Sequence, residues 1–197
     1  MSVANELFQS VTRLIDYREA DWVLLKNESA TILSWSPEIV SVFYHVLYDI
    51  DETRAIFQEG ERPKLEKNLS DWIASMVNGP KGDEFWEHQW FVALLHIKRG
   101  TKNLYTLGMM NRVQQLFLNK CMAHYAPDKA QQVFSAFLRV SGAVAALIAQ
   151  CYDVVVENSI REGMQKVGVN TALLERIKGM QVRKMLEEVA PRYGHGA

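Results

Sequence analysis

Apolar side chains recur at the spacing of an α-helix along almost the whole chain. Val40, Phe43, Tyr44 and Leu47, for example, follow one another at i, i+3, i+4 and i+7, which places them on one face of a helix. No stretch of five or more residues between turn signals alternates as a β-strand would. The prolines, at positions 37, 63, 80, 127 and 191, lie near expected helix boundaries. The sequence therefore predicts an all-α fold.

The same spacing predicts where the helices lie. Ser36-Pro37-Glu38 predicts a helix start, because serine can cap a helix, proline fits its first turn and glutamate favours its positive end. Arg99-Gly100 predicts a helix end, since glycine readily adopts the left-handed cap. We expect helices at residues 4–17, 19–33, 36–50, 63–78, 83–99, 103–124, 128–160 and 171–189.

Composition and charge exclude several classes of protein. The 22 basic and 23 acidic residues nearly balance, so no basic excess favours a nucleic acid or an anionic membrane as partner. Cys121 and Cys151 are too few for a disulfide framework, and we expect buried reduced thiols. The N-terminus lacks the pattern of a signal peptide, and the longest apolar run, residues 141–149, is shorter than a membrane span. We therefore expect a cytoplasmic protein.

Known catalytic motifs are missing from the sequence. It contains no GxSxG, Walker loop, GxGxxG, HExxH or paired Glu-x-x-His. Glu84, Glu87 and His88 crowd one helix, but no second carboxylate–histidine set completes a metal cage, so we expect a solvated face. A helix-turn-helix over residues 157–190 would lack a basic recognition face.

One histidine and one tyrosine remain as candidates for chemistry. His96 lies on the inner face of the helix at 83–99, where the common alternative is a core histidine with satisfied ring nitrogens. Tyr44 lies 52 residues earlier, and a buried tyrosine donates its hydroxyl hydrogen either to a backbone carbonyl or to a molecule in a pocket. A histidine facing an apolar cavity with a tyrosine across it suits haem, which needs an imidazole for its iron and a large apolar slot.

Three segments resemble the bacterial globin-coupled sensors and the related protoglobins. Phe43-Tyr44 is similar to the distal Phe-Tyr pair of that family. The segment from Pro63 to Ile73, PKLEKNLSDWI, resembles its distal helix, and Leu94–Gly100, LLHIKRG, resembles its proximal segment. The three similarities occur in the family's order over about residues 36–120.

The resemblance implies a globin-like three-over-three helical sandwich with an extra N-terminal helix and an added C-terminal helix. It implies haem b (heme b) with His96 as the proximal ligand of the iron and Tyr44 hydrogen-bonding bound dioxygen, CO or NO. It also implies a homodimer formed through the helix at 128–160 and its neighbour, which agrees with the apolar character of that helix on more than one face. The residues expected to bind the cofactor are His96, Tyr44, Leu65, Leu69, Phe57, Phe43 and Val92.

The sensors carry a C-terminal output domain, whereas we expect only one helix after the globin within these 197 residues. We expect a haem-binding sensor-type globin domain at residues 1–160 and a C-terminal extension with one helix at residues 161–197. A gas sensor that signals through a partner is the leading hypothesis. The alternatives are a haem enzyme that acts on NO or peroxide with an external reductase, and a haem-free helical interaction module in which His96 is a core residue.

Overall fold

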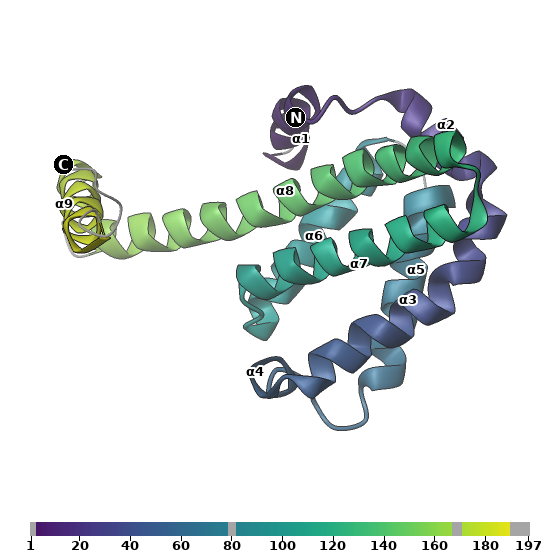
Figure 1. Ribbon diagram of the computed structural model, residues 1–197. Coiled ribbons are helices and arrows are strands. Elements are labelled where there is room, and N and C mark those ends of the chain that lie inside the picture. The colour runs from purple at the N-terminus through teal and green to yellow at the C-terminus, as the bar shows by residue number, and fades with distance from the viewer. Residues whose placement is uncertain (1–2, 79–81, 167–170, 190–197) are drawn as a thin grey trace. The chain divides into compact units, whose positions relative to one another are not determined.

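The structure of the protein is a computed structural model that describes residues 3–78, 82–166 and 171–189. All regular elements in these ranges are α-helices, as the sequence predicts (Figure 1). They are α1 (Val3–Leu14), α2 (Glu19–Asn27), α3 (Ser29–Asp49), α4 (Asp51–Arg54), α5 (Arg62–Asn78), α6 (Asp83–Arg99), α7 (Asn103–His124), α8 (Pro127–Lys166) and α9 (Thr171–Val189). Gly100 ends α6 in the left-handed conformation at φ 80°, which confirms the predicted cap.

The predicted helix start at Ser36-Pro37 is wrong. Pro37 lies inside α3, which begins eight residues earlier at Ser29. The apolar stripe explains this, because Ile32 and Ile39 are both buried and lie about two helical turns apart on either side of the proline. Ser36 is not a cap, and its hydroxyl lies 3.2 Å from that of Ser70 on α5. Burial of the first half of α3 outweighs the cost of proline within a helix.

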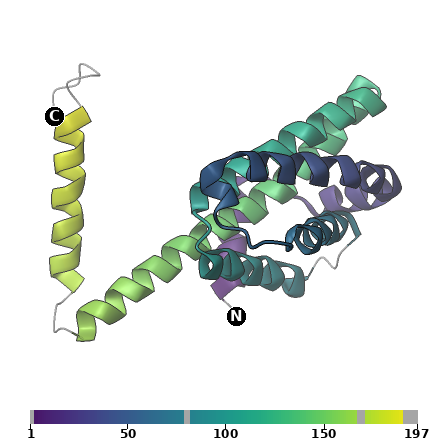
Figure 2. The ribbon, with the colours of Figure 1, turned by 90° about the horizontal axis from the view of Figure 1, so that it is seen from below.

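The helices of the N-terminal unit form two layers around one core. In Figure 1, α3, α7 and α8 lie in front of α5 and α6, and in Figure 2 α3 and α7 lie on one side with α5 and α6 on the other. The ring of Phe117 on α7 stacks on that of Phe137 on α8, with centroids 3.8 Å apart. The largest fully buried side chains are Trp22, Trp86, Phe117, Phe137, Leu25, Ile32, Ile39 and Met76.

The N-terminal helix α1 packs against α6. Phe8 stacks on Trp86 with ring centroids 3.7 Å apart, and the ring of Tyr17 meets the edge of the same tryptophan. This helix is the extra N-terminal element that the sequence predicts. It covers the side of α6 that carries Trp86, and so supports the helix that holds His96.

The chain divides into two compact units, Met1–Tyr152 and Asp153–Ala197, and α8 contributes residues to both. The boundary at residue 160 therefore falls within a continuous helix and stays a prediction. Among the described residues, α8 alone is long and apolar enough to span a membrane, although half of its most apolar window is buried within the protein. Such burial is usual for a core helix, and the helix is longer than the run at 141–149 suggested.

Candidate functional site

His96 lies in the last turn of α6 and presents one free ring nitrogen. Its Nδ1 lies 2.8 Å from the carbonyl oxygen of Val92. Because a carbonyl only accepts, Nδ1 carries the hydrogen and Nε2 keeps its lone pair. Burial lowers the pKa of His96, and the nearby charge of Arg99 lowers it further against the opposing effect of the Val92 hydrogen bond. The ring is therefore neutral near pH 7 and its Nε2 is able to bind a metal.

Two long side chains on α6 show which of its faces meets α5. The amide oxygen of Gln89 accepts a hydrogen bond of 2.9 Å from the indole nitrogen of Trp72. Ten residues later, Arg99 forms an ion pair of 2.6 Å with Glu61. Gln89, Val92, His96 and Arg99 are spaced at i, i+3, i+7 and i+10, so they share one helical face. Val92 and His96 lie on that face between the two bridges.

The partner residues define the matching face of α5. The N–H of Leu65 donates to the carbonyl of Glu61 at 3.1 Å, so helical geometry extends back to Glu61. Glu61, Leu65, Leu69 and Trp72 are then spaced at i, i+4, i+8 and i+11 along one stripe. The bridges join the early end of this stripe to the late end of α6, so the two helices run antiparallel. Leu65 and Leu69 consequently lie at the level of His96 and Val92.

Tyr44 of α3 contacts α5 at the level of His96. Its hydroxyl donates a hydrogen bond of 2.9 Å to the carbonyl of Leu65, and its ring lies 5.1 Å from that of Phe43 and 6.4 Å from that of Phe57. Burial raises the pKa of Tyr44, with a smaller contribution from Tyr48. The hydroxyl is therefore protonated at neutral pH and remains a hydrogen-bond donor.

The structure thus brings the predicted site residues to one region. Sequence reasoning missed Gln89 and Glu61, whose contacts set the register of the two helices. The spacing of Gln89 with Val92 and His96 was a usable signal, because a buried glutamine on a helix face requires a polar partner. The partner of Tyr44 is the backbone carbonyl that the sequence left open as one of two alternatives.

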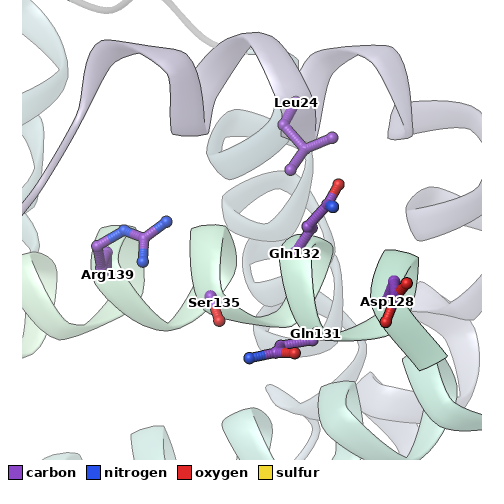
Figure 3. A pocket seen from close by; sticks show the side chains of 6 residues that line it. All are labelled: Leu24, Asp128, Gln131, Gln132, Ser135 and Arg139. Atoms are coloured by element: carbon purple, nitrogen blue, oxygen red, sulfur yellow. The ribbon is translucent and has the colours of Figure 1, made fainter.

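A hollow elsewhere on the surface does not share these residues. It has a volume of about 450 Å³ and lies between α2 and α8, lined by Leu24, Asp128, Gln131, Gln132, Ser135 and Arg139 (Figure 3). The guanidinium of Arg139 is already bound to the carboxylate of Asp21 through hydrogen bonds of 2.6 and 2.8 Å. Within the described part of the chain, no three histidine, cysteine or acidic residues are grouped so as to hold a metal ion.

The family model for protoglobin matches residues 4–157. The chain belongs to the protoglobin family. Among solved structures it is similar to the globin domain of a globin-coupled sensor from Geobacter sulfurreducens, with a TM-score of 0.68 and 20% identity over 73% of this chain and 96% of that one. No curated protein matches the sequence. The predicted all-α globin fold is confirmed.

Membership in this family implies haem binding in general, and the residues at the site fit that group. The facing stripes of α5 and α6 present Leu65, Leu69 and Val92 beside a single imidazole nitrogen, which suits an apolar macrocycle with an iron at its centre. Next to this face of α6, Phe91 is 54% exposed and Leu95 46% exposed. Apolar surface of this extent on a core-forming helix is favourable to cover.

Proposed function

We propose that the protein binds haem b and reversibly binds dioxygen or another diatomic gas, such as CO or NO, as a gas sensor. The observation that carries this proposal is the double bridge between α5 and α6. It confines the free Nε2 of His96 and the apolar side chains of Leu65 and Leu69 to one level. The family match supports haem binding, and the site geometry supports His96 as the proximal ligand.

The residues of the chain then have distinct roles. Haem held by His96 would supply an iron able to bind a diatomic gas. The Val92 carbonyl fixes the tautomer of His96 and orients its ring, as outer partners of metal-binding histidines do. Leu65, Leu69 and Val92, together with the rings of Phe43 and Phe57, would exclude water from the cofactor. Tyr44 would donate its hydroxyl hydrogen to the bound gas.

A visible absorption spectrum of the purified protein tests the proposal. We expect a Soret band that shifts on reduction with dithionite and shifts again with carbon monoxide. His96→Ala should lose haem or its characteristic reduced spectrum. His88→Ala is the matched control, because His88 lies on the same helix and is exposed, and it should leave every band in place. A wild-type protein that stays colourless after haemin is added would refute the proposal.

A further inference from the structure

Tyr152 of α8 reaches the segment that directly follows His96. Its hydroxyl donates a hydrogen bond of 2.8 Å to the backbone carbonyl of Thr101, 51 residues away in sequence. Thr101 lies between the end of α6 and the start of α7. Burial raises the pKa of Tyr152, so the hydroxyl keeps its hydrogen at neutral pH and the contact persists.

The backbone of Thr101 is also hydrogen-bonded to the backbone of His96. Its N–H donates to the carbonyl of His96 at 3.0 Å, and the N–H of Gly100 donates to the carbonyl of Ile97 at 2.9 Å. Gly100 adopts φ 80° in this turn, a conformation that other residues adopt only at a cost. The two hydrogen bonds and the glycine together form a cap that fixes Thr101 relative to the last turn of α6.

A continuous hydrogen-bonded connection therefore runs from α8 to the proximal histidine. The hydroxyl of Tyr152 holds the carbonyl of Thr101, the N–H of the same residue holds the carbonyl of His96, and the ring of His96 is held by Val92. Each bond is directional and sensitive to displacements of a few tenths of an ångström. A shift of His96 must then either stretch the bond to Tyr152 or move α8.

We infer that Tyr152 is a positioning residue that couples the proximal histidine to α8, so that binding of a gas at the site changes the local stability of α8. The neighbouring buried residues of α8, Leu147, Ile148 and Cys151, offer van der Waals contacts without this directionality. The inference rests on the proposed function, because His96 responds to a gas only if it binds the iron of haem.

The variant Tyr152→Phe tests the coupling, since it removes one hydroxyl and keeps the ring. Tyr125→Phe is the matched control, because the Tyr125 hydroxyl donates to Glu28 at 2.9 Å, at a contact that does not involve His96. Two properties are measured in the wild type and in both variants. The first is the iron–histidine stretching frequency of the reduced protein, and the second is the amide hydrogen exchange of residues 144–152 with and without carbon monoxide.

We expect carbon monoxide to change exchange in this part of α8 in the wild type and in Tyr125→Phe, and to leave it unchanged in Tyr152→Phe. In haem-free protein, Tyr152→Phe should raise the exchange rate of the amides between His96 and Tyr105 about fivefold, which corresponds to the loss of one ordinary hydrogen bond. The iron–histidine frequency should shift in Tyr152→Phe alone.

The outcomes separate the two hypotheses. A wild-type protein that takes up haem and carbon monoxide, together with a Tyr152→Phe variant that matches Tyr125→Phe in both measurements, would overturn the coupling and leave the proposed function standing. A wild-type protein that takes up no haem would overturn both.

Discussion

The hydroxyl of Tyr44 has one hydrogen and two possible acceptors. In the structure it donates to the Leu65 carbonyl at 2.9 Å, so donation to a bound gas requires that it leave this carbonyl. We expect Tyr44→Phe to accelerate dioxygen dissociation about fivefold, since one hydrogen bond to the ligand is worth roughly 1 kcal/mol. Rapid-mixing kinetics measures the rate, with Tyr125→Phe as the control. An unchanged rate would remove Tyr44 from its assigned role.

The two cysteines are predicted to be inert in the native protein. Both are buried with 0% exposure, which agrees with the sequence-based expectation. Burial raises the pKa of Cys121 to about 12 and that of Cys151 to about 11, so about one thousandth or less of either is the reactive thiolate at pH 8. A thiol reagent such as DTNB should react with neither in the native state and with both in denaturant. Fast reaction of the native protein would contradict this burial.

The sequence alone could identify those candidate site residues whose side-chain type restricts their chemistry. His96 and Tyr44 could be selected because each is polar on an apolar face. The contacts of Gln89 and Glu61 could not be predicted, because their partners Trp72 and Arg99 lie on another element and the pairing depends on how α5 and α6 are staggered. The 2.9 Å and 2.6 Å bridges of these residues are properties of that stagger.

The pairing of α5 with α6 depends partly on the ion pair between Glu61 and Arg99. The side chains are 13% and 36% exposed, so solvent screens the pair only in part. A double-mutant cycle with Glu61→Gln and Arg99→Gln should give a coupling free energy of about 1 kcal/mol in urea unfolding of the haem-free protein. The matched control is the pair of Lys67 and Asp71 on α5, which are 72% and 62% exposed, and whose coupling should be clearly smaller. Equal couplings would show that the bridge is merely a surface contact.

Glu28, between α2 and α3, makes contacts whose contribution to stability depends on pH. Its carboxylate binds Lys129 at 2.7 Å and accepts a hydrogen bond from Tyr125 at 2.9 Å. The Lys129 hydrogen bond lowers the pKa of Glu28 below 4.5, against the effect of burial and with the help of Tyr125. Because the folded-state pKa is the lower one, the resulting stability is present above pH 4.5 and is lost as the pH falls below it.

The variant Glu28→Gln tests this sign. The difference in free energy of unfolding between wild type and variant should shrink as the pH is lowered from about 6 to about 3. Urea unfolding at a series of pH values measures the difference, and other carboxylates cancel because they are common to both proteins. A difference that stays constant over this range would contradict the role of ionised Glu28.

Helix boundaries show where local signals were sufficient and where they failed. The ends of α7 and α9, at residues 103–124 and 171–189, match the prediction, because turn residues and apolar periodicity agree there. At Ser36-Pro37 they conflict, since capping residues favour a start whereas Ile32 and Ile39 continue the buried stripe through it. Tertiary burial prevails in such conflicts, and the sequence alone does not show what α3 packs against.

For the whole molecule, α8 carries the residues through which a second copy is proposed to bind. Leu138, Gly142, Ala145 and Ala149 lie at i, i+4, i+7 and i+11, and Leu138 is exposed while the other three are only partly buried. Small side chains let two helices approach closely, and Tyr152 continues the same stripe at i+14. The proposed coupling from His96 would thus reach the face through which we propose that two subunits bind each other.

This arrangement predicts a homodimer that is broken by charge on the exposed face of α8. Leu138 is 41% exposed, so replacing it with glutamate should spare the core of the subunit and place a buried charge in the dimer. Light scattering after size exclusion should change from about twice the chain mass of 22.6 kDa to that mass. Ile50→Glu is the control, because Ile50 is 44% exposed and lies just after α3, and it should remain dimeric.

A wild-type protein that elutes as a monomer at micromolar concentration would refute the dimer. A variant that stays dimeric would instead locate the interface away from this face of α8.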